Sequence, residues 1–132
     1  METRLPFDLR APAAARMVVD GALAQHVSAA TLDDAKLAMS ELVTNSLQHS
    51  GAAVHGTLLI GVGRHRGGFW LAVEDAGQDG FVGPRSPDRQ AGGGFGLHLV
   101  EDLSECWGTV RAARRGTRVW AQFSTAATHG EP

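Results

Sequence analysis

The spacing of apolar residues changes along the chain, and the first part has the period of amphipathic helices. Between residues 12 and 23 apolar side chains recur three and four positions apart after Pro12, which suits the first turn of a helix. The same spacing returns in a second helix that is predicted to begin near Thr31, whose hydroxyl can cap it, with Asp33 and Asp34 toward its positive end. The buried face of this second helix is predicted to comprise Leu32, Ala35, Met39, Leu42, Val43 and Ser46.

The middle of the chain has the composition of a β-hairpin. Residues 57–62 and 69–73 are apolar and rich in strand-forming side chains, and Gly67 with the glycine after it supplies a tight turn between them. Residues 3–9 alternate loosely and are predicted to form a short edge strand, because Pro6 lacks the N–H group that a central strand needs.

Residues 107–112 and 117–123 are predicted to form a second hairpin, after a short helix over residues 97–103. Apolar and polar side chains alternate in the last strand, which is typical of a sheet whose two faces differ. One face is predicted to meet the helices. Residues 76–94 are rich in glycine, proline and aspartate and are predicted to form a mobile loop, of a length that usually serves a function.

The largest apolar side chains are assigned to the interior. Trp70, Trp107 and Trp120 fall within predicted strands and are interpreted as sheet core. Met17 and Met39 fall within the two long predicted helices and are interpreted as helix core.

Length and composition predict one folded domain over residues 1–124, with a disordered tail over residues 125–132. The chain has 132 residues, of which 43% are hydrophobic and 20% charged, as in ordinary globular proteins. Cys106 is the only cysteine, which excludes an intramolecular disulfide and a cysteine-rich zinc site. The three histidines that could suggest zinc fit no common ligand spacing: His49, His55 and His98.

Charge and hydropathy disfavour nucleic acids and membranes as partners. A net charge of −2 gives no general field that would hold a polyanion. The cluster of Arg111, Arg114 and Arg115 is interpreted as a solvated turn. No apolar stretch reaches the length of a membrane span, so the protein is expected to be cytoplasmic.

Glu41 and Asn45 lie four residues apart on the second predicted helix, so their side chains share one face. A carboxylate can accept a proton from an attacking hydroxyl, and a neutral amide oxygen is a suitable ligand for Mg²⁺ beside phosphates. A solvated polar face is the commoner explanation for such a pair, so the pair alone does not establish a site.

Asp75 follows an apolar strand, where a carboxylate can accept a hydrogen bond from the exocyclic amine of a purine. Gly77 then allows the backbone to approach a flat ring closely, although a ligand-free Asp-x-Gly turn would have the same residues. Residues 92–96 hold four glycines before the last predicted helix, and their N–H groups suit phosphates, although a flexible hinge would use the same composition.

Together the three motifs resemble those of the GHKL ATPase superfamily. Ser40-Glu41-Leu42-Val43-Thr44-Asn45 is similar to its N box, Asp75-Ala76-Gly77 to its first glycine box, and Gly92 to Leu97 to its second. Within it, the chain is most similar to small bacterial anti-sigma factor kinases, over about residues 5–124. The resemblance implies an α+β fold: a two-layer sandwich with a mixed, mostly antiparallel sheet and helices on one face.

The resemblance also implies roles for the matching residues. Glu41 would be the general base, Asn45 the Mg²⁺ ligand and Asp75 the residue that reads adenine. Further contacts to ATP are implied for Gly77, Gly92, Gly94, Gly96, Leu97 and Thr117.

By the same resemblance the partners would be a sigma factor and an anti-sigma factor antagonist that is phosphorylated on serine or threonine. The alternative is a non-catalytic module in which ATP changes a protein-binding surface. Arg16 resembles a partner-contacting position, although an exposed, solvated arginine is the commoner explanation. A homodimer through the edge strand and first helix is also implied.

Overall fold

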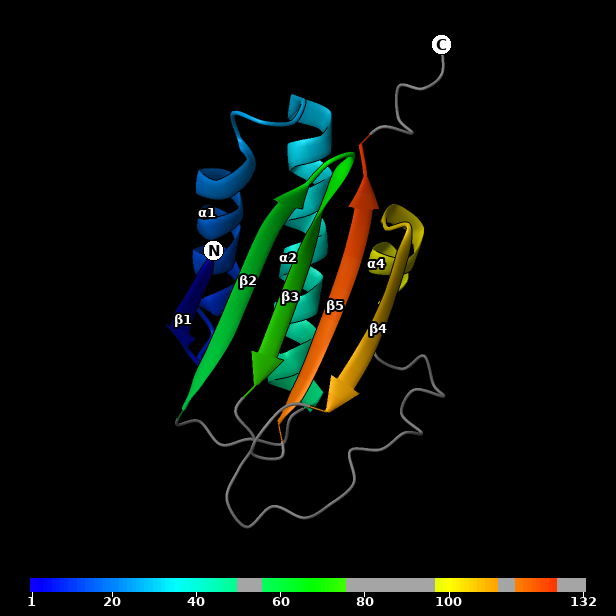
Figure 1. Ribbon diagram of the computed structural model, residues 1–132. Helices are drawn as coiled ribbons and strands as arrows, with labels where there is room; N and C mark the ends of the chain where they lie inside the picture. The colour runs from blue at the N-terminus through cyan, green and yellow to red at the C-terminus, as the bar shows by residue number, and fades with distance from the viewer. Residues whose placement is uncertain (50–55, 76–96, 112–115, 126–132) are drawn as a thin grey trace.

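In the computed structural model, residues 1–49, 56–75, 97–111 and 116–125 are described, and they form a sheet with helices on one face (Figure 1). The two layers confirm the predicted α+β sandwich. In chain order the elements are β1 (Glu2–Pro6), α1 (Ala11–Leu23), α2 (Ala29–His49), β2 (Thr57–His65), β3 (Gly68–Asp75), α4 (His98–Leu103), β4 (Cys106–Arg111) and β5 (Thr117–Ser124).

The sheet has five strands in the order β1-β2-β3-β5-β4. Each of the four neighbouring pairs is antiparallel, so the described strands include none of the parallel pairing that a mixed sheet would contain. β1 is an edge strand, as predicted, and β3 is central. The chain passes from β3 through α4 to the far edge strand β4 before β5 fills the position between them. As a result, the end of β3, the start of β5 and the end of α2 lie at one end of the molecule (Figure 1).

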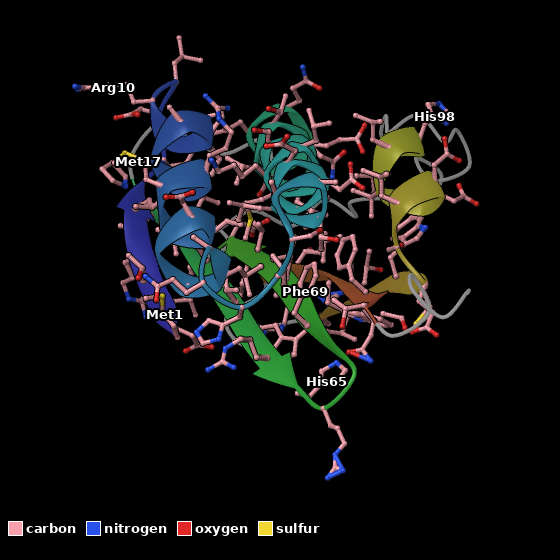
Figure 2. All side chains as sticks on the ribbon, turned by 90° about the horizontal axis from the view of Figure 1, so that it is seen from above. Met1, Arg10, Met17, His65, Phe69 and His98 are labelled. Carbon is pink, nitrogen blue, oxygen red and sulfur yellow. The ribbon has the colours of Figure 1, made fainter. Side chains whose placement is uncertain are left out.

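The core lies between the helices and the inner face of the sheet, where Phe69 points toward the helix layer (Figure 2). Phe69 on β3 stacks on Phe123 of β5 with ring centroids 4.7 Å apart. Met39 and Leu42 of α2 are fully buried, as predicted. Burial of a side chain of this size stabilises the fold by roughly 1.5–3 kcal/mol, so the buried face of α2 holds the helix that carries Glu41 and Asn45 against the sheet.

Met17 is not a core residue, contrary to the prediction. The buried positions of α1 follow one another at intervals of four residues: Ala11, Ala15, Val19 and Leu23. Met17 lies two residues from that row, on the opposite side of the helix, and is 74% exposed (Figure 2). Neither α1 nor any other helix in the described part of the chain combines the length and apolar character that crossing a bilayer requires.

The start of α2 also differs from the prediction. The helix begins at Ala29, and the hydroxyl oxygen of Ser28 accepts a hydrogen bond from the N–H of Thr31 at 3.1 Å. Ser28 is therefore the capping residue instead of Thr31. Asp33 and Asp34 consequently lie beyond the first turn of the helix.

Trp70 and Trp120 lie on the outer face of the sheet, so the prediction that they belong to its core is wrong. Trp70 alternates along β3 with the buried Phe69 and Leu71, and it packs over Gly63 of β2. Glycines on neighbouring strands leave space for the two indole rings, Gly63 for Trp70 and Gly108 for Trp120. A Cβ atom added at Gly63 would lie 2.3 Å from the ring of Trp70. Trp107 is partly buried and does pack against the core.

Candidate nucleotide-binding site

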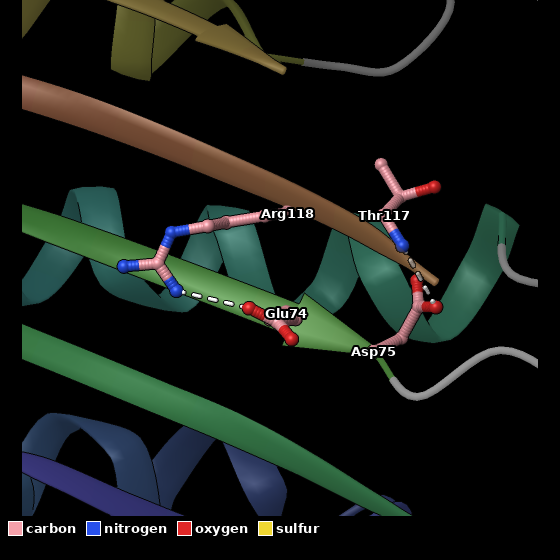
Figure 3. Close-up of polar contacts among 4 residues, drawn as sticks. All are labelled: Glu74, Asp75, Thr117 and Arg118. Carbon is pink, nitrogen blue, oxygen red and sulfur yellow. Dashed lines mark hydrogen bonds and ion pairs between the residues drawn. The ribbon is translucent and has the colours of Figure 1, made fainter. Parts of the chain in front are cut away.

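Asp75 is the last residue of β3 and is 5% exposed. Its Oδ1 accepts a hydrogen bond from the backbone N–H of Thr117, the first residue of β5, at 3.3 Å (Figure 3). The contact exists because β3 and β5 are antiparallel neighbours, which brings the end of one strand beside the start of the other. The carboxylate is thereby buried and fixed in orientation.

Glu74 and Arg118 form a second contact between the same two strands. They are directly opposite each other in the β3–β5 register, and Arg118 Nη1 lies 3.1 Å from Glu74 Oε1 (Figure 3). The guanidinium carbon also lies 5.9 Å from the centroid of the Trp70 ring, within cation–π range. Both side chains are 26% exposed, so the pair is worth about 1 kcal/mol at most. Sequence reasoning missed this pair, which only the strand register brings together.

Asn45 projects from α2 and is 6% exposed. Within the described part of the chain its Oδ1 is buried without a hydrogen-bond partner. An unsatisfied buried carbonyl costs about 1–3 kcal/mol, and a residue that carries such a cost is a candidate for ligand binding. A neutral amide oxygen is a hard donor, so the observation fits a Mg²⁺ ligand.

Glu41 lies one turn before Asn45 on α2. Its Oε1 accepts the N–H of Val100 at 2.8 Å, and its Oε2 lies 3.5 Å from the N–H nitrogen of Leu99. The carboxylate therefore faces the first turn of α4, the helix that follows the glycine-rich segment. Leu97 is predicted to contact ATP. Its side chain is 5% exposed and lies in the core, and its carbonyl oxygen accepts a hydrogen bond from the N–H of Glu101 at 2.9 Å.

The predicted phosphate-binding glycines lie outside the described residues, as does the glycine predicted to approach the base: Gly77, Gly92, Gly94 and Gly96. Their roles stay predictions. The described part of the site consists of a sheet end with Asp75 and a helix face with Glu41 and Asn45. The C-terminal end of α2 lies behind that end of the sheet in Figure 1, so the end of the helix and the end of β3 lie at one end of the molecule.

A comparison with protein families decides the assignment. The histidine kinase-like ATPase domain matches residues 5–123. The chain belongs to this family. Membership confirms the superfamily resemblance that the three motifs predicted, and it implies that the nucleotide is ATP. No match was found among curated proteins.

A solved structure extends the likeness of this histidine kinase-like ATPase domain to its fold. The crystal structure of the RsbU and RsbW domains of Rv1364c from Mycobacterium tuberculosis superposes with a TM-score of 0.69 at 20% sequence identity. The match covers 94% of this chain and 32% of that one, so the chain spans about a third of the length of the protein it matches. At this identity the similarity establishes the fold.

Proposed function

We propose that this domain binds Mg²⁺-ATP and acts as an anti-sigma factor type of regulator, which phosphorylates a serine or threonine of an antagonist protein. The observation that carries the proposal is the Oδ1 of Asn45, which is buried and has no partner among the described residues, one helical turn from the carboxylate of Glu41. A cation ligand and a base on one helix face suit the transfer of a phosphoryl group to a hydroxyl.

Asp75 would select adenine. Its carboxylate accepts the N–H of Thr117, and the resulting orientation allows it to accept a second hydrogen bond from the exocyclic amine of adenine. Guanine has a carbonyl oxygen at the corresponding position and would be repelled by the carboxylate. Thr117 thus contributes to the purine site through its backbone.

Asn45 would hold the metal through its amide oxygen, and the glycines of residues 92–96 would bind the phosphates with backbone N–H groups. When bound, Mg²⁺ neutralises charge on the phosphates and orients them. Glu41 would accept the proton of the attacking serine or threonine hydroxyl. The hydroxyl oxygen would bond to the γ-phosphorus of ATP as the bond between that phosphorus and the leaving ADP breaks.

Regulation through a sigma factor needs a second surface, and α1 offers one. Arg16 is exposed, and its Nη1 donates a hydrogen bond to Ser40 Oγ at 2.8 Å. Ser40 directly precedes Glu41 in the sequence. Met17 beside it is 74% exposed, so an apolar and a cationic group adjoin on this helix. A homodimer through β1 and α1 remains an expectation from the family resemblance.

A phosphotransfer assay tests the proposal. Purified protein, labelled ATP and the cognate antagonist should give a phosphorylated antagonist, and Glu41→Gln should slow the transfer about a hundredfold or more. The amide keeps the shape of the side chain but cannot take the proton. Transfer by Glu41→Gln at the wild-type rate would contradict the assigned base.

The contacts of Glu41 favour a second candidate, a non-catalytic module that responds to ATP. Both carboxylate oxygens face backbone N–H groups of α4, as expected of a structural residue. In that case the wild-type protein would bind ATP and change its affinity for a protein partner without phosphorylating it. The same assay, run beside ATP titration, separates the two functions.

A further inference from the structure

The start of α4 lacks a cap of its own. Leu97 occupies the capping position but its side chain is buried in the core and offers no oxygen. Leu99 and Val100 are the second and third residues of the helix. The N–H groups at these two positions are the ones that a capping serine or aspartate side chain normally accepts. These are the two N–H groups that face Glu41.

We infer that Glu41 is a positioning residue for α4, and that its two oxygens have different tasks. Oε1 serves as the cap of α4 from 59 residues earlier in the chain, because it accepts the Val100 N–H at 2.8 Å. Among the described residues, Oε2 has only the 3.5 Å contact with Leu99, which is longer than an ordinary N–H···O hydrogen bond. Oε2 is therefore the oxygen assigned to the substrate proton.

The anchor has a mechanical consequence. α4 follows the glycine-rich segment directly, and Val100 is fully buried while Leu99 is 39% exposed. The carboxylate therefore fixes the start of α4 to the helix that also holds Asn45. The assignment of Oε2 rests on the proposed kinase function, whereas the assignment of Oε1 does not.

The test of the anchor is amide hydrogen exchange of the full chain without nucleotide. In Glu41→Ala the Val100 amide should exchange about tenfold faster than in wild type, the expected effect of losing a hydrogen bond to a charged group. In Glu41→Gln the amide oxygen still accepts a hydrogen bond, so the rate should stay within about threefold of wild type. The amide of Met39, in the interior of α2, reports on that helix and should not change.

Asp34→Ala is the matched control, because it removes a carboxylate from an exposed position of the same helix. It should leave the exchange of Val100 unchanged. Equal protection of Val100 in Glu41→Ala and wild type would overturn the anchor, as would exchange in Glu41→Gln as fast as in Glu41→Ala. If Glu41→Ala does not fold, Glu41→Leu, which keeps the bulk of the side chain but has no oxygen, replaces it and should show the same faster exchange of Val100.

Phosphotransfer by the same variants tests the division of labour. Glu41→Gln should keep the protection of Val100 and lose phosphotransfer. Phosphotransfer by Glu41→Gln at the wild-type rate would refute the role of Oε2. The hydrogen bond between Oε1 and Val100 would then still be tested by the exchange data. Absence of transfer in the wild type would refute the proposed kinase, and would also remove the role of Oε2, but would not alter the exchange result.

Discussion

Within the described part of the chain, Asn45 Oδ1 and Ser104 Oγ are buried without a hydrogen-bond partner, and of the two only Asn45 lies on α2, one turn from Glu41. Replacement by leucine, which has nearly the same shape, removes the unpartnered buried oxygen. We expect the free energy of unfolding of Asn45→Leu without nucleotide to stay the same or rise by about 1 kcal/mol, since the variant no longer buries that oxygen. Urea denaturation measures this change.

The same variant should lose the contribution of Mg²⁺ to ATP affinity. In wild type Mg²⁺ should tighten ATP binding, whereas Asn45→Leu should bind ATP about tenfold more weakly in the presence of the ion. A fall of several kcal/mol in the free energy of unfolding, with the effect of Mg²⁺ intact, would instead make Asn45 a structural residue.

At the scale of single residues, the types of side chain needed by the site were predictable and their contacts were not. The spacing of Glu41 and Asn45 placed them on one helix face, because the helical period is fixed. The cap of α4 by Glu41 joins residues 59 positions apart, and no local pattern encodes such a contact. Likewise, the pairing of Asp75 with Thr117 depends on the register of β3 and β5.

At the scale of the elements, the outer face of the sheet is built by matching tryptophans with glycines. Gly63→Ala would force the ring of Trp70 away from β2, because the new Cβ would lie 2.3 Å from the ring. We expect the free energy of unfolding to fall by about 1–3 kcal/mol, as in other overpacked sites. Chemical denaturation followed by circular dichroism measures the change.

Gly21→Ala is the matched control within α1. A Cβ at this position meets nothing within 4 Å, and alanine favours a helix over glycine by about 0.5–1 kcal/mol. This variant should therefore be more stable than wild type. If Gly63→Ala were equally stabilised, the close packing of Trp70 on β2 would not exist in solution.

The elements themselves were largely predictable, because each has a clear period or turn signal. α1, the β2–β3 hairpin and the last strand lie within a few residues of their predicted bounds. The errors concern which side faces the core. Trp70 and Trp120 are large and apolar, but the alternation of side chains along a strand places them on the outer face of the sheet. There they pack over glycines of the neighbouring strands, which sequence hydropathy does not indicate.

At the scale of the whole molecule, the antiparallel sheet gathers the end of β3, the start of β5 and the end of α2 at one end (Figure 1). The order of the strands could not be predicted from hydropathy, because β5 lies between β3 and β4 in the sheet although it follows both of them in the sequence. The family resemblance supplied the two layers in advance but not the order of the strands, and the contribution of residues 76–96 stays a prediction.

The proposed binding of ATP depends on a purine site at Asp75, so calorimetric titration with Mg²⁺-ATP tests it most directly. Asp75→Asn keeps one oxygen for the N–H of Thr117 but has no second oxygen for adenine, and should bind ATP about tenfold to hundredfold more weakly than wild type. Wild-type protein should also prefer ATP to GTP. Equal ATP affinities of Asp75→Asn and wild type, or equal affinities of the wild type for ATP and GTP, would contradict the assignment.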